Sequence, residues 1–365
     1  MQSALDRIER GLARRKLDAL LVTQPENRRY LSGYTATDHS IAETSGILLI
    51  LANGKTPYLL TDSRYELQAR AEAKGFRVKL YPRGFFVLLR RLLGSEKIKH
   101  LAFESHYFLH STAQTLEKLA KEKRVTLAPL TGLVEELRLQ KSGEELARIE
   151  AAVRMNEAVF AEVYRAMRPG QTEKEIAHRI ENAMRAHGAE GPSFDTIVAA
   201  GPNGALPHAV PTDRPMEKGE PIIIDMGLRL NGYCSDMTRT VVLGTPDSRA
   251  VAMIRLVRKA QLAGQKALKA GVSGLVVDRA ARSVIEHAGH GDHFGHGLGH
   301  GVGLNVHEGP SLSYRNRKQL LPNMVVTVEP GVYLPGWGGV RLENMAVVEE
   351  KGCRILNHDT TFLDI

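Results

Sequence analysis

The 365-residue chain has few of the features that mark an exported or a membrane protein. It contains two cysteines, Cys234 and Cys353, and neither belongs to a Cys-x-x-Cys pair. This argues against a disulfide framework and against a thiolate zinc site. No apolar run reaches the roughly 18 residues that a membrane span needs, and the N-terminus lacks the apolar core of a signal peptide. We therefore expect a cytoplasmic protein with no membrane partner.

Aromatic residues make up only 5% of the chain, and its net positive charge comes from one part of the sequence. Residues 1–130 carry an excess of nine positive charges, whereas residues 131–365 carry an excess of one negative charge, giving the net +8. Such an excess could attract nucleic acid or an acidic partner. No aromatic residues are interleaved with the basic ones and no recognition motif accompanies them. We interpret the excess as a solvated basic surface and keep nucleic-acid binding as an alternative.

The length favours two domains. In residues 1–130, short apolar runs alternate with amphipathic segments, which is typical of an α/β domain. Strands are predicted at 18–22, 46–51, 57–61, 76–81, 99–103 and 125–128, and helices ahead of the first strand and at 63–74 and 107–123. The turn residues Asn53 and Gly54 predict a hairpin between the second and third of these strands.

Residues 131–365 contain a weak internal repeat. Ser142 with Glu145, and Thr172 with Glu175, have the spacing of helix capping boxes. A helix between Gly170 and Gly188 is echoed by one between Gly271 and Gly289, at an offset of 101 residues. A long predicted helix precedes each (142–168 and about 248–270), and predicted strands follow. We interpret this part as two helix–helix–strand halves, a pseudo-duplication.

Carboxylates end or interrupt the apolar strands of this part. Asp225 closes the run Pro221–Ile224, and Glu329 closes Met324–Val328 before a Pro-Gly turn. Asn231-Gly232 predicts a two-residue hairpin in which Asp225 lies opposite Thr238 and Asp236 opposite Gly227. Because side chains alternate along a strand, Asp225 and Asp236 should then share one face of the sheet.

Two further segments complete the candidate site. His300 lies in a glycine-rich stretch that would let the backbone approach a metal or a substrate closely, with His307 on a predicted strand, 304–308. A strand at 339–344 places Arg341 and Glu343 on one face. Each residue alone is more often a turn or solvated residue. Together they form a ligand set that could hold two divalent cations: Asp225, Asp236, His300, Glu329 and Glu343.

Five ordered motifs resemble the pita-bread metallopeptidases, the family of methionine aminopeptidase, Xaa-Pro aminopeptidase and Xaa-Pro dipeptidase (prolidase). They are AAGPNGALPHAVP (199–211), IIIDMGLRLNGYCSDMTRT (222–240), HGLGHGVGLNVHEGP (296–310), VTVEPGVY (326–333) and GVRLENMAVV (339–348). The resemblance implies a creatinase-like N-terminal α/β domain, 1–130. It also implies an α+β pita-bread catalytic domain with a pseudo-twofold duplication, 131–365.

The resemblance also implies roles for single residues. Asp225 would bind one metal, Asp236 and Glu343 both metals, and His300 and Glu329 the other. His208 and His307 would contact substrate and stabilise the tetrahedral intermediate, His296 would lie beside the substrate, and Arg341 would support a ligand. Glu329 would also move the proton of the attacking water. Asn305 and Asn344 depart from the family, because an acid is frequent at both positions.

The implied activity is that of an Xaa-Pro aminopeptidase, which removes the first residue from peptides with proline at position 2. Two alternatives remain: an Xaa-Pro dipeptidase, and a metal-free creatinase-like enzyme or binding protein of the same fold. The expected cofactors are two divalent ions, manganese first and cobalt, zinc or iron as alternatives. A homodimer is expected, because dimers are common in the family.

Overall fold

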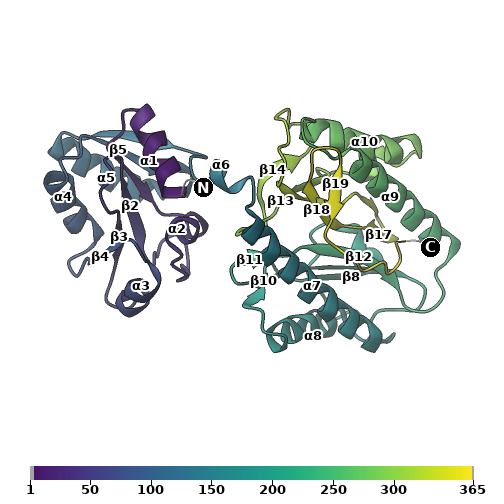
Figure 1. Ribbon diagram of the computed structural model, residues 1–365. Coiled ribbons are helices and arrows are strands. Elements are labelled where there is room, and N and C mark those ends of the chain that lie inside the picture. Colours follow the sequence, from purple (N-terminus) through teal and green to yellow (C-terminus); the bar gives the residue numbers. More distant parts are fainter. Residues whose placement is uncertain (1–3, 364–365) are drawn as a thin grey trace. The chain divides into compact units, whose positions relative to one another are not determined.

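The computed structural model describes residues 4–363, which form two compact units (Figure 1). One unit extends to Arg138 and the other begins at Leu139. The boundary expected at residue 130 differs from this division. Val134 packs into the apolar core of the first unit together with Leu133 and Leu137. Leu137 belongs to the short helix α6 (Glu135–Arg138), with which this unit ends. No helix within residues 4–363 is long and apolar enough to cross a membrane.

The N-terminal unit is built on a six-stranded sheet in the order β4-β3-β2-β1-β5-β6. The strands are β1 (Ala19–Val22), β2 (Ile47–Leu51), β3 (Tyr58–Thr61), β4 (Arg77–Leu80), β5 (His100–Glu104) and β6 (Thr126–Leu130). All six were predicted, and β2 and β3 form the expected antiparallel pair.

Helices cover both faces of this sheet. Alternate residues of β1 and β2 face α4 (Phe85–Ser95) and α5 (His110–Lys123) on one side. The residues between them face α1 (Ala4–Arg14), α2 (Pro25–Ser32) and α3 (Glu66–Glu72) on the other side. Helices α2, α4 and the short α6 were not predicted: α2 buries the polar residues Asn27 and Arg28, and α4 begins with the unbroken apolar run Phe85–Leu89.

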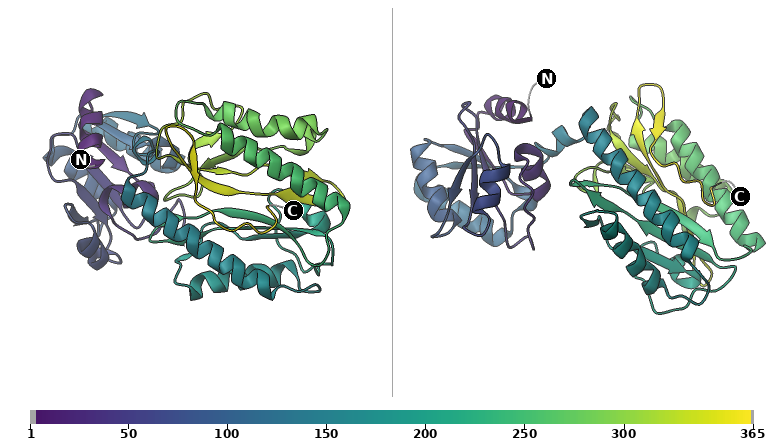
Figure 2. Two further views of the ribbon diagram at one scale, coloured as in Figure 1. Left: turned by 45° about the vertical axis from the view of Figure 1, so that its right-hand side comes forward. Right: turned by 60° about the horizontal axis from the view of Figure 1, so that its bottom comes forward.

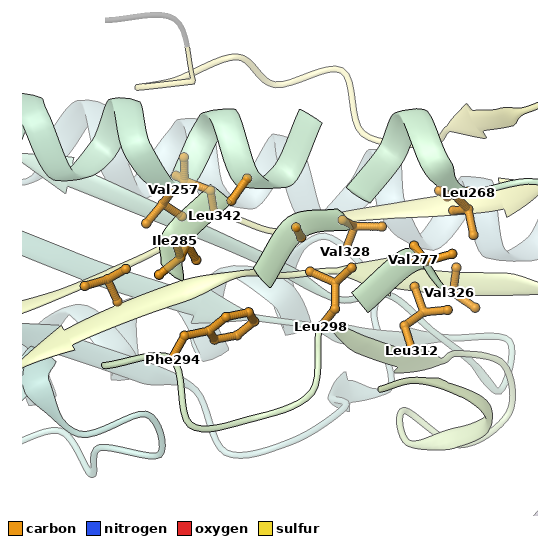
Figure 3. Packing of buried hydrophobic residues seen from close by; sticks show 14 of the residues in the cluster. Val257, Leu268, Val277, Ile285, Phe294, Leu298, Leu312, Val326, Val328 and Leu342 are labelled. Atoms are coloured by element: carbon orange, nitrogen blue, oxygen red, sulfur yellow. The ribbon is translucent and has the colours of Figure 1, made fainter. Parts of the chain in front are cut away.

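The unit that begins at Leu139 corresponds to the expected catalytic domain, and two pairs of helices flank the strands of this catalytic unit (Figures 1 and 2). The first pair is α7 (Gly143–Ala166) and α8 (Glu173–Ala186), and the second is α9 (Ser248–Ala267) and α10 (Gly274–His287). Both predicted capping boxes are present, at Ser142 and Thr172. Each helix pair covers the strands that follow it, so the unit has two apolar clusters, one for each half. Figure 3 shows part of the cluster of the second half, to which Val257, Ile285, Phe294 and Leu298 belong.

Short sheets lie between the helix pairs. The first half contains the orders β11-β10-β7 and β12-β9-β8, and the second contains β14-β13-β15-β18-β19 and β16-β17. In the first half the strands are β7 (Gly191–Pro192), β8 (Ile197–Ala200), β9 (Pro221–Met226), β10 (Leu228–Leu230), β11 (Tyr233–Cys234) and β12 (Met237–Val242). In the second they are β13 (Gly299–Gly301), β14 (Glu308–Leu312), β15 (Val325–Val328), β16 (Gly331–Leu334), β17 (Gly338–Arg341), β18 (Asn344–Val348) and β19 (Cys353–Ile355).

The two halves repeat each other in their backbone hydrogen bonds. The N–H of Gly170 donates to the carbonyl of Met216 at 2.8 Å, and the N–H of Gly271 donates to that of Leu320 at 2.9 Å. Each half also has an isolated β-bridge at the start of its second helix, Thr172 with Pro215 and Ser273 with Gln319. Thr172 and Ser273 are 101 residues apart, which is the predicted offset. The pseudo-duplication predicted from glycine spacing therefore extends to the chain geometry around both helix starts.

Candidate metal centre

The hairpin that carries Asp225 has the predicted register. Asp225 lies opposite Thr238 in the β9–β12 ladder, and Leu230 lies opposite Tyr233 beside the turn. The ladder is interrupted between these two stretches, where a side chain on Gly227 would collide with the carbonyl of Ser235. Asp236 lies in this interruption, immediately before β12, rather than within a strand.

Of the three ligand candidates of the second half, one lies within a short strand and two lie just beyond strand ends. His300 is in β13, Glu329 follows β15, and Glu343 lies between β17 and β18. The strand predicted over 339–344 is thus broken at Leu342–Glu343, because the N–H of Glu343 donates instead to the carbonyl of Thr238. Strand ends place these side chains at the rim of each sheet, where they can converge.

All five candidates line one pocket of about 670 Å³ inside the catalytic unit. Ligand atoms of Asp236, His300 and Glu343 lie within 4.8 Å of one another. The Nε2 atom of His300 is 3.2 Å from Oε1 of Glu329 and 3.6 Å from Oδ2 of Asp236. His208, His296, His307 and Arg341 line the same pocket.

Polar side chains donate hydrogen bonds to three of the candidate carboxylates. Arg341 donates to Oδ2 of Asp225 at 2.6 Å. The hydroxyl of Thr238 donates to Glu343 at 2.7 Å, and that of Thr327 donates to Glu329 at 3.0 Å. Each contact orients a carboxylate and leaves its other oxygen for a further partner. The supporting roles of the two threonines were not predicted from the sequence.

Two carboxylate oxygens in the pocket are buried without a hydrogen-bond partner, Oδ1 of Asp225 and Oε1 of Glu343. Burial, followed by the charges of Glu343 and Asp225, raises the pKa of Asp236 well above its usual range. Burial and the charges of Glu329 and Asp225 do the same to the pKa of Glu343. Buried, unpaired carboxylates in mutual repulsion are costly unless cations neutralise them. This donor set therefore fits divalent metal ions with a preference for oxygen and imidazole ligands.

His300 and Glu329 form a charged pair in the metal-free protein. Burial opposes ionisation of both groups, but the hydrogen bond and the charge attraction between them are stronger. They lower the pKa of Glu329 to about 2 and raise the pKa of His300 to about 9. A metal ion that bound this imidazole would displace its proton.

Tyr333 connects the ligand side of the pocket to His296. Its hydroxyl accepts a hydrogen bond from Arg341 at 2.8 Å and lies 2.8 Å from Nε2 of His296. The other ring nitrogen of His296 is 2.8 Å from the carbonyl of Gly297, and burial lowers the pKa of this imidazole. Both ring nitrogens are therefore engaged by the protein. Tyr333 was not singled out from the sequence, although it lies four residues after Glu329 in a quoted motif.

His307 lies in a bend between β13 and β14, not on the predicted strand 304–308. The strand is prevented by Asn305, whose Oδ1 accepts from the backbone N–H of His307 at 3.2 Å and closes a tight turn. The rings of His300 and His307 meet edge to face with centroids 4.3 Å apart. Burial and the charge of His300 lower the pKa of His307.

The chain matches known families over both units. Residues 147–350 match metallopeptidase family M24, and residues 5–140 match the Creatinase/Prolidase N-terminal domain. The chain belongs to family M24. It is thus a metallopeptidase, and the expected fold, a creatinase-like N-terminal domain followed by a pita-bread catalytic domain, is confirmed.

Known proteins resemble this chain along nearly its whole length. An uncharacterised peptidase of Bacillus subtilis, YqhT, is 37% identical over 94% of both chains. A structure of an Xaa-Pro dipeptidase from Bacillus anthracis is 35% identical, with a TM-score of 0.90 over 98% of this chain and 97% of that one. A structure of an X-Pro aminopeptidase from Thermotoga maritima is 38% identical, with a TM-score of 0.87 over 97% and 98%.

Proposed function

We propose that this M24 metallopeptidase is an Xaa-Pro aminopeptidase that works with two divalent ions, manganese first among them. The observation that carries the metal site is the pair of buried, unpartnered oxygens on Asp225 and Glu343 within a cluster of four carboxylates. The preference for proline is supported by the relatives named Xaa-Pro dipeptidase and X-Pro aminopeptidase.

In this proposal the metals are held by Asp225, Asp236, His300, Glu329 and Glu343. When bound, two such ions would lower the pKa of a water so that it can lose a proton near neutral pH and act as the nucleophile. They would also polarise the carbonyl group that is attacked. The protein contributes ligands that are already oriented by Arg341, Thr238 and Thr327.

The remaining steps fall to side chains of the pocket. Glu329 takes a proton from the attacking water and delivers it to the leaving nitrogen. His208 and His307 donate hydrogen bonds to the oxygen that becomes negative in the tetrahedral intermediate. His296 and Arg341 border the substrate. A proline nitrogen carries no N–H, so the bond to it is a poor substrate for general peptidases and requires a dedicated pocket.

The charges that line the pocket favour the aminopeptidase over the dipeptidase. A strict dipeptidase must recognise the carboxylate of the proline that leaves. Among the described residues that line the pocket, Arg341 is the one lysine or arginine. Its guanidinium already donates to Asp225, Tyr333 and the carbonyl of Pro207. No other lysine or arginine in this lining is available to hold the carboxylate of the leaving proline, which favours a substrate that continues beyond the proline.

The Xaa-Pro dipeptidase remains a second candidate, because relatives with this name include a Pyrococcus furiosus protein that is 31% identical over 98% of both chains. Turnover of Ala-Pro, Ala-Pro-Ala and Ala-Ala-Ala by manganese-loaded protein separates the cases. We expect Ala-Pro-Ala to be cleaved to alanine and Pro-Ala, and Ala-Ala-Ala to be a poor substrate. Cleavage of Ala-Pro alone would assign the dipeptidase. Failure on both proline peptides with bound metal would refute the proposal.

We also propose that the protein is a cytoplasmic homodimer. Both cysteines are free thiols, and Cys234 is buried, as expected in a reducing compartment. The dimer is inferred from the family resemblance. Light scattering during size-exclusion chromatography tests it, and a mass of one chain, 40.2 kDa, would contradict it.

A further inference from the structure

A buried ion pair lies behind the bend that carries His307. The ammonium of Lys141 is 2.8 Å from Oε1 of Glu308, the residue that follows His307. The side chain of Lys141 is 1% exposed and that of Glu308 is 10% exposed. A lysine is rarely buried to this degree without a specific partner. The proposed reaction assigns no task to either residue.

The carboxylate of Glu308 is packed into the bend itself. Its Oε2 accepts a long hydrogen bond, 3.5 Å, from the backbone N–H of Asn305. It also lies against the Cα of Gly303, so that any side chain there would strike it. The N–H of Gly303 donates to the carbonyl of Asn305 at 3.0 Å. Residues 303–308 are thus folded around the Glu308 carboxylate.

Two further contacts fix this bend to its surroundings. The carbonyl of Gly303 accepts from the N–H of Cys234 in β11 at 2.8 Å. The side chain of Leu139 packs closely on the Cα of Gly309. The ammonium of Lys141 also donates to the carbonyl of Leu139 at 3.3 Å. The backbone N–H of Lys141 donates to the carbonyl of Asn323 at 2.8 Å. Leu139–Lys141, the first residues of the catalytic unit, are therefore held in place beside the bend.

From these contacts we infer that Lys141 is a positioning residue for His307 and acts through Glu308. The buried ion pair fixes the bend, and the bend fixes the imidazole at the wall of the pocket. A misplacement of about 1 Å can lower the rate of an enzyme about 100-fold. This inference rests on the proposed function, because it assumes that His307 contacts the substrate.

The test is a mutant cycle between Lys141 and His307. We expect Lys141→Met to lower kcat on Ala-Pro-Ala about 10- to 100-fold. In a His307→Ala background the same substitution should change kcat by less than about twofold, because the positioned group is gone. An equal loss in both backgrounds would overturn the inference and indicate a general structural effect. Glu308→Gln, which keeps the shape but removes the charge, should show the same dependence on His307.

Two measurements do not depend on turnover. Hydrogen exchange at the amides of Asn305 and His307 should be faster in Lys141→Met, and unchanged exchange would contradict the inference. Manganese affinity, measured calorimetrically, should stay near the wild-type value, and a parallel loss of metal would also contradict it. Gln140→Ala is the matched control, because this neighbouring side chain is exposed and donates only to the carbonyl of Pro322. If the wild-type protein cleaves no Xaa-Pro peptide, the proposed function fails, while the exchange data still decide whether Lys141 holds the bend.

Discussion

The two halves of the catalytic unit share a backbone plan but differ in the chemistry that they contribute. In each half a buried amide from the long helix caps a strand next to a ligand carboxylate. Asn156 of α7 donates to the carbonyl of Met226 at 2.9 Å, beside Asp225, and Gln261 of α9 donates to that of Val328 at 3.3 Å, beside Glu329. Among the five ligand candidates, the first half supplies the carboxylates Asp225 and Asp236, whereas the second supplies two carboxylates and the imidazole of His300.

The ligand candidates of each half also receive hydrogen bonds from residues of the other half. Arg341, from the second half, donates to Asp225 of the first. Thr238, from the first half, donates to the carboxylate of Glu343, and Arg239 donates to the carbonyl of the same residue. A duplicated scaffold thus gives one centre because its supports cross between the halves. We expect damage to a support in one half to appear as a metal defect in the other.

The largest effect should come from removing one ligand of either half. We expect Asp236→Asn and Glu343→Gln each to lower kcat/KM by more than the roughly 10- to 100-fold cost of losing a supporting contact. The measurement is steady-state turnover of an Xaa-Pro peptide with metal content determined in parallel. Asp213→Asn is the control, because this acid of the same unit is 81% exposed and pairs with Lys174 at the surface. Near wild-type turnover with full metal content in either ligand variant would remove that residue from the proposed centre.

Loss of the hydrogen bond between the halves, from Arg341 to Asp225, should produce the next largest effect. Arg341→Met removes the guanidinium that donates to Asp225, so we expect manganese affinity to fall about 10- to 100-fold. Isothermal titration of metal into the stripped protein measures this loss directly. Arg279→Met, an exposed position on α10, is the matched control. Unchanged affinity in the Arg341 variant would show that the halves hold their ligands independently.

Metal binding should release protons from both halves, and the second half adds the proton of the His300 imidazole. The pKa of His300 is about 9 in the metal-free protein, so the imidazole must lose a proton to become a ligand near neutral pH. The raised pKa values of Asp236 and Glu343 act in the same direction. Metal affinity should therefore increase as the pH rises toward about 9 and then level off. Calorimetry in buffers of different ionisation enthalpy counts the protons, and binding without proton release would contradict the charged His300–Glu329 pair.

The sequence predicted most clearly what depends on local spacing. The Asn231-Gly232 turn and the period-two alternation set the register that places Asp225 opposite Thr238. Capping boxes at Ser142 and Thr172 set the starts of α7 and α8. Each of these signals is contained within a few consecutive residues, so it can be recognised in the sequence without knowing the rest of the fold.

The features that were missed depend on side-chain contacts, some local and some between residues far apart in the chain. Thr327, Tyr333 and Lys141 carry no unusual local pattern, and their roles follow from contacts that only the folded chain creates. His307 was expected on a strand because apolar and polar residues alternate over 304–308, but the turn at Asn305 prevails. The metal-ligand and substrate roles of the site residues stay predictions, which the experiments above test.

The smallest effect should come from the one cap that the halves do not share. The Thr172 side chain accepts from the N–H of Glu175 at 3.1 Å in a complete capping box, whereas Ser273, at the equivalent position of α10, makes no side-chain cap. Thr172→Ala should lower the free energy of unfolding by about 1 kcal/mol. Ser273→Ala is the matched control and should cost much less, because it removes no hydrogen bond from the helix start. Chemical denaturation with a fixed metal concentration measures both, and equal losses would mean that the two helix starts are stabilised alike despite their different caps.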